Sequence, residues 1–504
     1  MRRAILSMSA IALAAAGCAY LPSVGPDYSE PGLPGGGSVV LPDAGYPTTN
    51  KTDLGEWKPA EGAEDVRALV TTNDIAQWWC RFDDGVLTNL VADAVKGNLS
   101  YKMAQSRLEQ SRWALFGSYA AFMPTVAVNG SGTMKHAERY TSSQYSAWHS
   151  TGSKRNYGDL FRGGFDASWE IDIFGGSRRA TESAEAEMQA AEWSLADAWV
   201  TLTAEVGREY IELRTTQQRI AVARTNLVLQ TETYDILKSR FDSGIGDELA
   251  VNQSKYVVDQ THATIPPLLA QEEKLMNAIA VLTGDIPGAR HAELKDCPAR
   301  DWLLEPAKVA EVPLDMLRAR PDVRAAERRL AAQTAQVGVA KSLWFPKLYI
   351  NGTLGLESVK VHKFFGKGDF YGAIGPSVSW PIFQGGSVYA NVKAAEARVD
   401  EAFLAYESSV QNAYREIRDA YAAYTQQYHR YQALQGAVKA AQDAVAIAND
   451  LYKNGLRDFT AVIDAQRSLL TLNEALVVTR GQITLDLIAL FKALGGGFYS
   501  LEGE

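Results

Sequence analysis

Residues 199–241 read WVTLTAEVGREYIELRTTQQRIAVARTNLVLQTETYDILKSRF, a stretch with a regular spacing of apolar residues. Every seventh residue in it is apolar or aromatic: Trp199, Val206, Leu213, Ile220, Leu227, Tyr234 and Phe241. A seven-residue repeat of this length keeps one seam of a helix turned toward a partner, as in a coiled coil. We therefore expect an unbroken helix from about Arg178 to Asp242, roughly 95 Å long at 1.5 Å per residue. Ordinary amphipathic helices in a large bundle are the alternative, but such helices rarely run beyond about 25 residues.

The same apolar track recurs 211 positions further along the chain: Val410, Ile417, Tyr424, Tyr431, Val438, Val445 and Tyr452. Other residues recur as well: Phe345-Pro346 corresponds to Met123-Pro124, and Trp380 corresponds to Trp169. The chain is therefore internally duplicated. Each half is expected to hold a helix, a strand, a polar loop, a second strand, a very long helix and a further helix. The expected divisions are a signal peptide (1–17), a lipid-anchored arm (18–82), a first repeat (83–290), a linker (291–313), a second repeat (314–497) and a tail (498–504).

The first residues predict the compartment. Two arginines precede a short apolar run, which ends in Ala15-Ala16-Gly17-Cys18. This pattern is typical of a secretory signal peptide. Cys18 directly after Ala-Gly resembles a bacterial lipobox, in which the cysteine is lipidated, although Ala15 stands where leucine is usual. Ala19 rather than aspartate follows the cysteine, which favours sorting to the outer membrane. The alternative is a plain cleavage site followed by an incidental cysteine.

Composition and motifs argue against catalysis, metal binding and nucleic-acid binding. The net charge is −9, so no basic surface for nucleic acid is indicated. Beyond Cys18 only Cys80 and Cys297 remain, which predicts neither a disulfide framework nor a zinc site. The six histidines are scattered, and no sequence motif of a hydrolase, metalloprotease or nucleotide-binding loop occurs. We expect no enzyme, no cofactor and no metal.

The clearest strand runs from Phe165 to Asp172. Its apolar residues Phe165, Ala167, Trp169 and Ile171 alternate with polar, mostly acidic residues. In a soluble sheet this is a half-buried strand, whereas in an outer-membrane barrel the apolar residues face lipid and the polar ones line water. Four strands cannot close a barrel, and open sheet edges are not tolerated in lipid. If these strands enter a membrane, other subunits must complete the barrel.

Several further stretches carry a family resemblance. They are Trp79–Phe82, Trp169–Gly175, Arg320–Val323, Gly375–Pro381, Asp464–Leu469 and Ala493–Gly497. In this order and spacing they resemble TolC-type outer-membrane efflux proteins, and more closely the lipoprotein branch that is OprM-like and NodT-like. The resemblance implies a mainly α fold with membrane β-strands, in which a homotrimer forms a 12-stranded β-barrel and a periplasmic α-barrel.

The function implied is a passive exit duct for small toxic compounds. The partners implied are outer-membrane lipid, a periplasmic adaptor and an inner-membrane efflux pump. One alternative is a periplasmic coiled-coil adaptor or structural lipoprotein that does not span the outer membrane, which would need no apolar outer strand face. The other is the outer-membrane duct of a protein-secretion system.

The tips of the long helices are expected to form a gate. Gly244 and Gly455 predict the turns there. The candidate gate residues are Asp247 at the first turn and, at the second, Tyr452, Arg457, Asp458 and Asp464. The family resemblance implies that Tyr452, Arg457 and Asp464 hold the periplasmic aperture closed. Ala461 stands where a further acidic residue is often found in the family, and Ala250 occupies the equivalent place in the first half. The alternative is a solvated helix turn whose charges do nothing.

Overall fold

The computed structural model describes residues 23–31, 38–40, 77–133, 160–295, 311–313, 317–359, 364, 369–454 and 456–496. The expectations for the signal peptide, Cys18, Gly455 and the tail lie outside these residues. The chain divides into two compact units. The first comprises Met1–Glu30, Glu109–Gln189 and Arg328–Leu404, and the second comprises Pro31–Leu108, Ala190–Glu327 and Ala405–Glu504.

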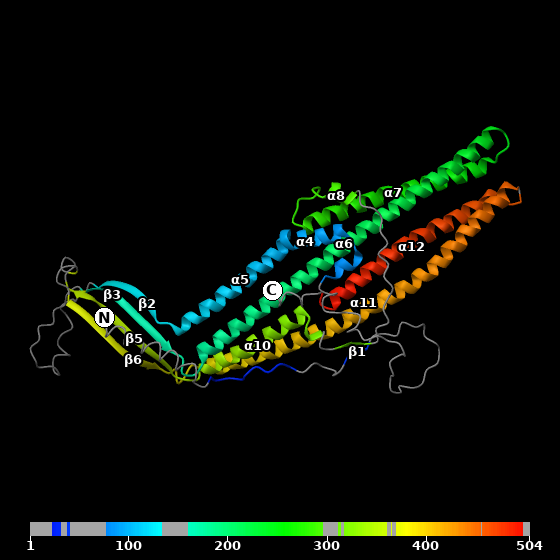
Figure 1. Cartoon of the computed structure of the whole chain (residues 1–504). Helices are drawn as coiled ribbons and strands as arrows, with labels where there is room; N and C mark the ends of the chain where they lie inside the picture. Colours follow the sequence, from blue (N-terminus) through cyan, green and yellow to red (C-terminus); the bar gives the residue numbers. More distant parts are fainter. Residues whose placement is uncertain are drawn as a thin grey trace, which may run out of the picture. The chain divides into compact units, whose positions relative to one another are not determined.

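The predicted duplication is confirmed, and the long helices repeat it residue for residue (Figure 1). Helix α6 spans Gly176–Asp242 and helix α11 spans Ser387–Lys453, each 67 residues long. Each is followed by a 35-residue helix, α7 (Glu248–Leu282) or α12 (Phe459–Ala493). The bounds of α11 and α12 each lie 211 positions after those of α6 and α7. Neither α6 nor α11 contains proline, so nothing in either sequence interrupts the backbone ladder.

The turn after α6 forms where the sequence predicts it. Gly244 adopts a positive φ of 75°, a conformation that favours glycine, and its N–H donates to the carbonyl of Phe241. Asp247 then begins α7, since its carboxylate accepts a hydrogen bond from the N–H of Leu249 at 3.0 Å.

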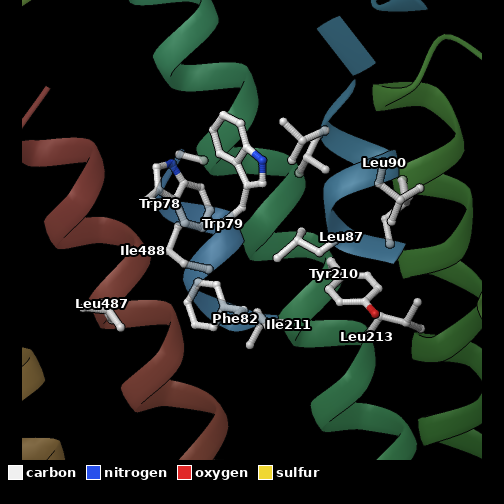
Figure 2. Close-up of a cluster of buried hydrophobic side chains, with 14 of the residues drawn as sticks. Trp78, Trp79, Phe82, Leu87, Leu90, Tyr210, Ile211, Leu213, Leu487 and Ile488 are labelled. Carbon is white, nitrogen blue, oxygen red and sulfur yellow. The ribbon is translucent and has the colours of Figure 1, made fainter. Parts of the chain in front are cut away.

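The core of the second unit forms around aromatic residues that precede the first long helix. The short helix η1 (Trp78–Phe82) buries Trp78, which stacks on Phe491 of α12 with 5.9 Å between ring centroids. Figure 2 shows the rings of Trp78 and Phe82 between α6 and α12. Within α6, Val206 and Leu213 of the heptad track are fully buried, whereas Phe241 at its end is 39% exposed. The seam is therefore covered in the middle of the helix and open toward its end.

Two local features differ from the expected layout. The helix expected at the start of the first repeat is two helices, α4 (Gly85–Gly97) and α5 (Leu99–Tyr119). Asn98 separates them, because its side chain accepts from the N–H of Tyr101 and donates to the carbonyl of Leu282. The core also begins at Trp78, inside the expected arm, and η1 is joined to α4 by Asp84, which caps α4.

The linker and the arm contribute short pieces to the second unit. Helix α8 (His291–Lys295) lies in the linker. Strand β1 (Ser38–Val40) of the arm pairs antiparallel with β4 (Glu311–Pro313) of the linker. In the first unit, residues 23–30 of the arm run without regular structure, and the N–H of Val24 donates to the carbonyl of Phe174 at 3.1 Å. The described part of the arm thus packs on other segments of the chain.

The first unit contains one four-stranded antiparallel sheet in the order β2-β3-β5-β6 (Figure 1). The strands are β2 (Thr125–Thr133), β3 (Leu160–Ile171), β5 (Lys347–Ser358) and β6 (Asp369–Ser379). A short helix η2 (Ala120–Phe122) precedes β2, and helix α10 (Pro321–Ser342) precedes β5. The sheet therefore consists of two hairpins, one from each half of the duplicated chain.

Candidate functional site

One face of the sheet is apolar across all four strands. The predicted residues Phe165, Ala167, Trp169 and Ile171 share it, because side chains two apart on a strand point the same way. The strand register extends this face, since Val126 on β2 and Gly352 on β5 lie opposite Ala167, and Ile374 lies opposite Gly352. Most of its large side chains are exposed, Ile374 to 83%. A continuous exposed apolar surface of this kind marks contact with lipid or with another protein.

The opposite face is polar, and its side chains are bonded to one another across the strands. The Asn129 amide donates to the Asp166 carboxylate, and the Ser168 hydroxyl donates to the Asn351 amide oxygen at 2.9 Å. The Asn351 amide donates in turn to the Ser377 hydroxyl at 2.8 Å. Two ion pairs continue the pattern, Arg162 with Glu357 at 2.7 Å and Lys347 with Glu170 at 2.9 Å. Such a face is suited to water, and the sheet combines the two surfaces that an outer-membrane strand needs.

The tryptophans that the repeat singles out have equivalent roles at the ends of the two hairpins. The Trp169 indole N–H donates to the carbonyl of Phe122 at 2.9 Å, and that of Trp380 donates to the carbonyl of Trp344 at 3.1 Å. Each bond ties the end of one strand to the segment just before its hairpin partner. An indole satisfied in this way is typical of residues with one apolar and one polar side.

At the helix tips, Tyr452 packs within its own chain. Its ring meets that of Phe459 edge-on at 5.1 Å between centroids, and the Arg240 guanidinium lies 5.7 Å from its ring centre. Leu237 and Val462 belong to the same buried cluster. The sequence prediction did not include Arg240 or Phe459. The sequence does point to Arg240, because it directly precedes Phe241, which corresponds to Tyr452 in the first half of the repeat.

The remaining gate candidates are exposed, and the single chain does not join them. Among the described residues, no ion pair or side-chain hydrogen bond connects Arg457 with Asp458 or Asp464. Asp458 precedes α12 without capping it, whereas Asp247 caps α7. The cluster at Tyr452 is thus formed by one chain, while the charges of Arg457 and Asp464 face outward.

The Arg320–Val323 stretch has a structural role that the sequence alone did not reveal. The buried guanidinium of Arg320 contacts the carboxylates of Asp322 and Glu416 at 2.8 Å each, and donates to the carbonyl of Ala493 at 2.6 Å. It thereby fastens the beginning of α10 to the end of α12. Burial, with a smaller contribution from the nearby Asp322 carboxylate, raises the pKa of Asp197 beside this cluster.

In the described part of the chain, no helix is both long and apolar enough to cross a bilayer. No three histidine, cysteine, aspartate or glutamate side chains there are placed to hold a metal ion.

Comparison with known proteins gives a consistent result. The family model of outer membrane efflux proteins matches residues 90–285 and 312–496. Nodulation protein T of Rhizobium leguminosarum bv. trifolii is 29% identical over 481 residues, which are 94% of each chain. The toluene efflux pump outer membrane protein TtgF of Pseudomonas putida is 27% identical over 500 residues, 98% of this chain and 97% of TtgF.

Solved structures agree with the sequence relatives. The outer-membrane channel OprN matches with a TM-score of 0.79 and 30% identity, covering 94% of this chain and 99% of that one. The two-faced sheet, the duplicated long helices and these matches all lead to one assignment. The chain belongs to the outer membrane efflux protein family and is an outer-membrane efflux channel with a large periplasmic portion.

Proposed function

We propose that the chain works as a homotrimer that serves as the passive exit duct for small toxic compounds. A periplasmic adaptor and an inner-membrane pump would deliver the compounds. The observation that carries this proposal is the four-stranded sheet with one apolar face, one polar face and two free edges. Lipid tolerates no open edge, so four strands become a membrane barrel only when further copies complete it. Export of small molecules is also supported by the similarity to TtgF, which is described as part of a toluene efflux pump.

In this proposal Phe165, Ala167, Trp169 and Ile171 face lipid, and the polar ladder from Asn129 to Ser377 lines water. A periplasmic adaptor or structural lipoprotein would have no use for the exposed apolar face. A duct for protein secretion would use the same sheet, so cargo must distinguish it. We propose no catalytic role for any residue.

The sequence further supports lipidation of Cys18, which would add a lipid anchor in the outer membrane. Incorporation of a fatty-acid probe into the wild type, and its absence from Cys18→Ala, is the expected result. A wild-type protein that takes up no probe would contradict the lipid anchor and leave the channel proposal unaffected.

Gene deletion and complementation test the function. Deletion should sensitise cells to dyes, detergents and small antibiotics, and the wild-type gene should restore resistance while pump and adaptor genes stay intact. Tagged protein should also capture an adaptor from detergent extracts after cross-linking. Unchanged sensitivity across the whole panel, together with loss of a secreted protein, would favour the secretion duct instead.

We also propose that Arg457 and Asp464 form the gate latch between neighbouring copies. Both face outward at the tips, and within the chain neither pairs with the other. Asp247 and Asp458 supply further carboxylates at the two turns, and Tyr452 is held in place by Phe459 and Arg240. An exposed ion pair is typically worth about 0–1 kcal/mol, but a trimer would break three together.

Replacing Arg457 and Asp464 together with alanine should therefore raise single-channel conductance in planar bilayers. It should also admit large antibiotics that the wild type excludes. The matched control removes an ion pair elsewhere in the same unit, half-buried Arg219 and exposed Glu474, which lie 2.6 Å apart. A gate double variant that assembles and conducts like the wild type would place the latch elsewhere.

A further inference from the structure

A pocket of about 480 Å³ lies between the middle of α6 and the end of α7, within the second unit. In this region Val206 and Tyr210 of α6 and Met276 and Ile279 of α7 pack into the core. Residues on other faces of the two helices line the pocket. They are Glu205, Arg208 and Glu209 of α6, Lys274, Asn277, Ala278, Val281 and Leu282 of α7, and Pro287 of the following turn.

The turn that carries Pro287 is held in place by its own residues. Gly284 adopts a positive φ of 81°, which favours glycine. The Asp285 carboxylate accepts hydrogen bonds from the Thr283 hydroxyl at 3.0 Å and from the Arg290 guanidinium at 2.7 Å. The pocket therefore has two helices and a fastened turn as walls, and its volume falls in the range of small-molecule sites, about 300–1,000 Å³.

Acidic groups outnumber basic groups at this pocket. The carboxylates of Glu205, Glu209 and Glu212 stand against the cations of Arg208 and Lys274. Arg208 already contacts two of these carboxylates, that of Glu209 at 2.7 Å and that of Glu212 at 3.4 Å. Glu205 forms no ion pair with any residue that the structure describes. Three carboxylates against two cations leave one negative charge in excess.

The excess charge is felt at Glu209, whose side chain is only 15% exposed. Burial raises the pKa of Glu209, and the carboxylates of Glu212 and Glu205 add to the rise, whereas Arg208 and Lys274 oppose it. A further positive charge in the pocket would favour the ionised form of Glu209. The pocket thus lacks a cation that a ligand can supply.

The rest of the wall is apolar. It consists of Ala278, Val281, Leu282 and Pro287, and the Val281 side chain is 57% exposed. A ligand with an apolar body would remove this surface from water, which is favourable in proportion to the area covered. An anion of the same shape would be repelled by the excess of carboxylates.

We propose that this pocket binds small amphipathic organic cations. The positive charge of the ligand lies at Glu205 and Glu209, and its apolar body lies against Val281 and Pro287. Because the lining residues come from α6, α7 and the turn after α7, a bound cation bridges the two helices. This site is a feature of the single chain, and it depends neither on the homotrimer nor on the exported cargo proposed above.

Two probes of nearly equal size and opposite charge test the proposal, tetraphenylphosphonium and tetraphenylborate. Calorimetry measures the binding of each to the full-length protein in detergent, after the heat of titration into protein-free micelles has been subtracted. Tetraphenylphosphonium should bind saturably, and tetraphenylborate should not. At saturation, tetraphenylphosphonium should also raise the melting temperature by about 2 °C or more, because it binds the folded chain.

Variants at Glu205 assign the binding to this pocket. Glu205→Gln should weaken tetraphenylphosphonium binding about five- to tenfold, since it removes the carboxylate without an ion pair. The matched control Glu232→Gln removes the same charge roughly 40 Å further along α6, at 1.5 Å per residue, and should bind like the wild type. Glu205→Lys should abolish tetraphenylphosphonium binding and create binding of tetraphenylborate. A gain of binding cannot result from misfolding.

Three results would overturn the proposal. The first is a wild type that does not bind tetraphenylphosphonium saturably. The second is equal binding of both probes, which would mean that apolar contact alone holds them. The third is a Glu205→Gln variant with the affinity of the wild type, which would place the site elsewhere. None of these results affects the proposed exit duct, because drug sensitivity after gene deletion tests that function separately.

Discussion

The apolar face of the sheet makes the sharpest prediction, because the same substitution can be placed on either face at nearly the same height. Ala167 lies on the apolar face in the row that contains Val126, Gly352 and Ile374. Ala373 lies on the polar face one residue away along β6, opposite Thr353. Ala167→Arg puts a guanidinium into the proposed lipid layer, whereas Ala373→Arg puts the same group into the proposed water-filled interior.

The expected difference is large. An arginine on the lipid face costs about 2–4 kcal/mol at the bilayer midplane and about 0–1 kcal/mol near the interfaces. Since 1.4 kcal/mol is a factor of ten, the upper range corresponds to roughly 30- to 1,000-fold in the folding equilibrium of each chain. A trimer carries the substitution three times. Ala373→Arg should leave assembly nearly unchanged and should lower cation conductance.

The assay is the yield of folded trimer in the outer membrane, measured by migration on gels before and after heating, together with refolding into vesicles. Ala167→Arg should lose most of its trimer, and Ala373→Arg should retain it. Equal loss for both variants would mean that both faces are packed against protein. Equal tolerance would mean that the apolar face does not meet lipid, and the alternation argument would fail.

Two further predictions concern the helical unit. Gly207→Ala should destabilise by about 1–3 kcal/mol despite the better helix propensity of alanine, because a Cβ there would lie 2.5 Å from the Trp78 ring. Gly436→Ala, where a Cβ meets no atom within 4 Å, is the control and should stabilise slightly; urea unfolding measures both. Burial raises the pKa of Asp197 in the folded state above its value in the unfolded chain. The protonated carboxyl therefore contributes to folding stability below about pH 4, and this contribution is lost as the pH rises through the raised pKa. Asp197→Asn should therefore raise the melting temperature at pH 7 and change it little at pH 4. The control Asp259→Asn, at an exposed position, should leave the melting temperature unchanged at both pH values. An equal gain for Asp197→Asn at pH 4 and pH 7 would show that ionisation of Asp197 does not cause the effect.

The regular parts of the fold could be predicted because each follows from a short-range pattern. The heptad track predicts the long helices, and the alternation from Phe165 to Ile171 predicts a two-faced strand. Comparing Trp169 with Trp380 gives the duplication without any structural information. Local patterns and internal repeats of this kind can be detected in a single sequence.

What the sequence did not predict depends on contacts between distant segments. The break at Asn98 exists because its amide reaches Leu282, 184 positions away. The role of Arg320 depends on the carbonyl of Ala493 at the end of another helix. The sequence analysis assigned Trp78 to the arm, because only the folded structure brings Phe491 into contact with it. Periodicity carries no information about such pairs.

The two halves of the duplicated chain differ in the helices that follow the turns at the tips, α7 and α12. Helix α7 contains Pro266 and Pro267, whereas the corresponding positions of α12 are Val477 and Val478. Each proline removes one backbone donor and costs about 3 kcal/mol in a helix interior, against under about 1 kcal/mol for valine. The penalty falls in the middle of α7, between its buried contacts near the tip and those near its end. We therefore expect the tip half of α7 to open locally at a lower free-energy cost than the tip half of α12, which native-state hydrogen exchange of the two helices measures. Equal exchange protection on both sides of Pro266 and Pro267, matching that of α12, would show that the two helix pairs α6–α7 and α11–α12 are equally stable.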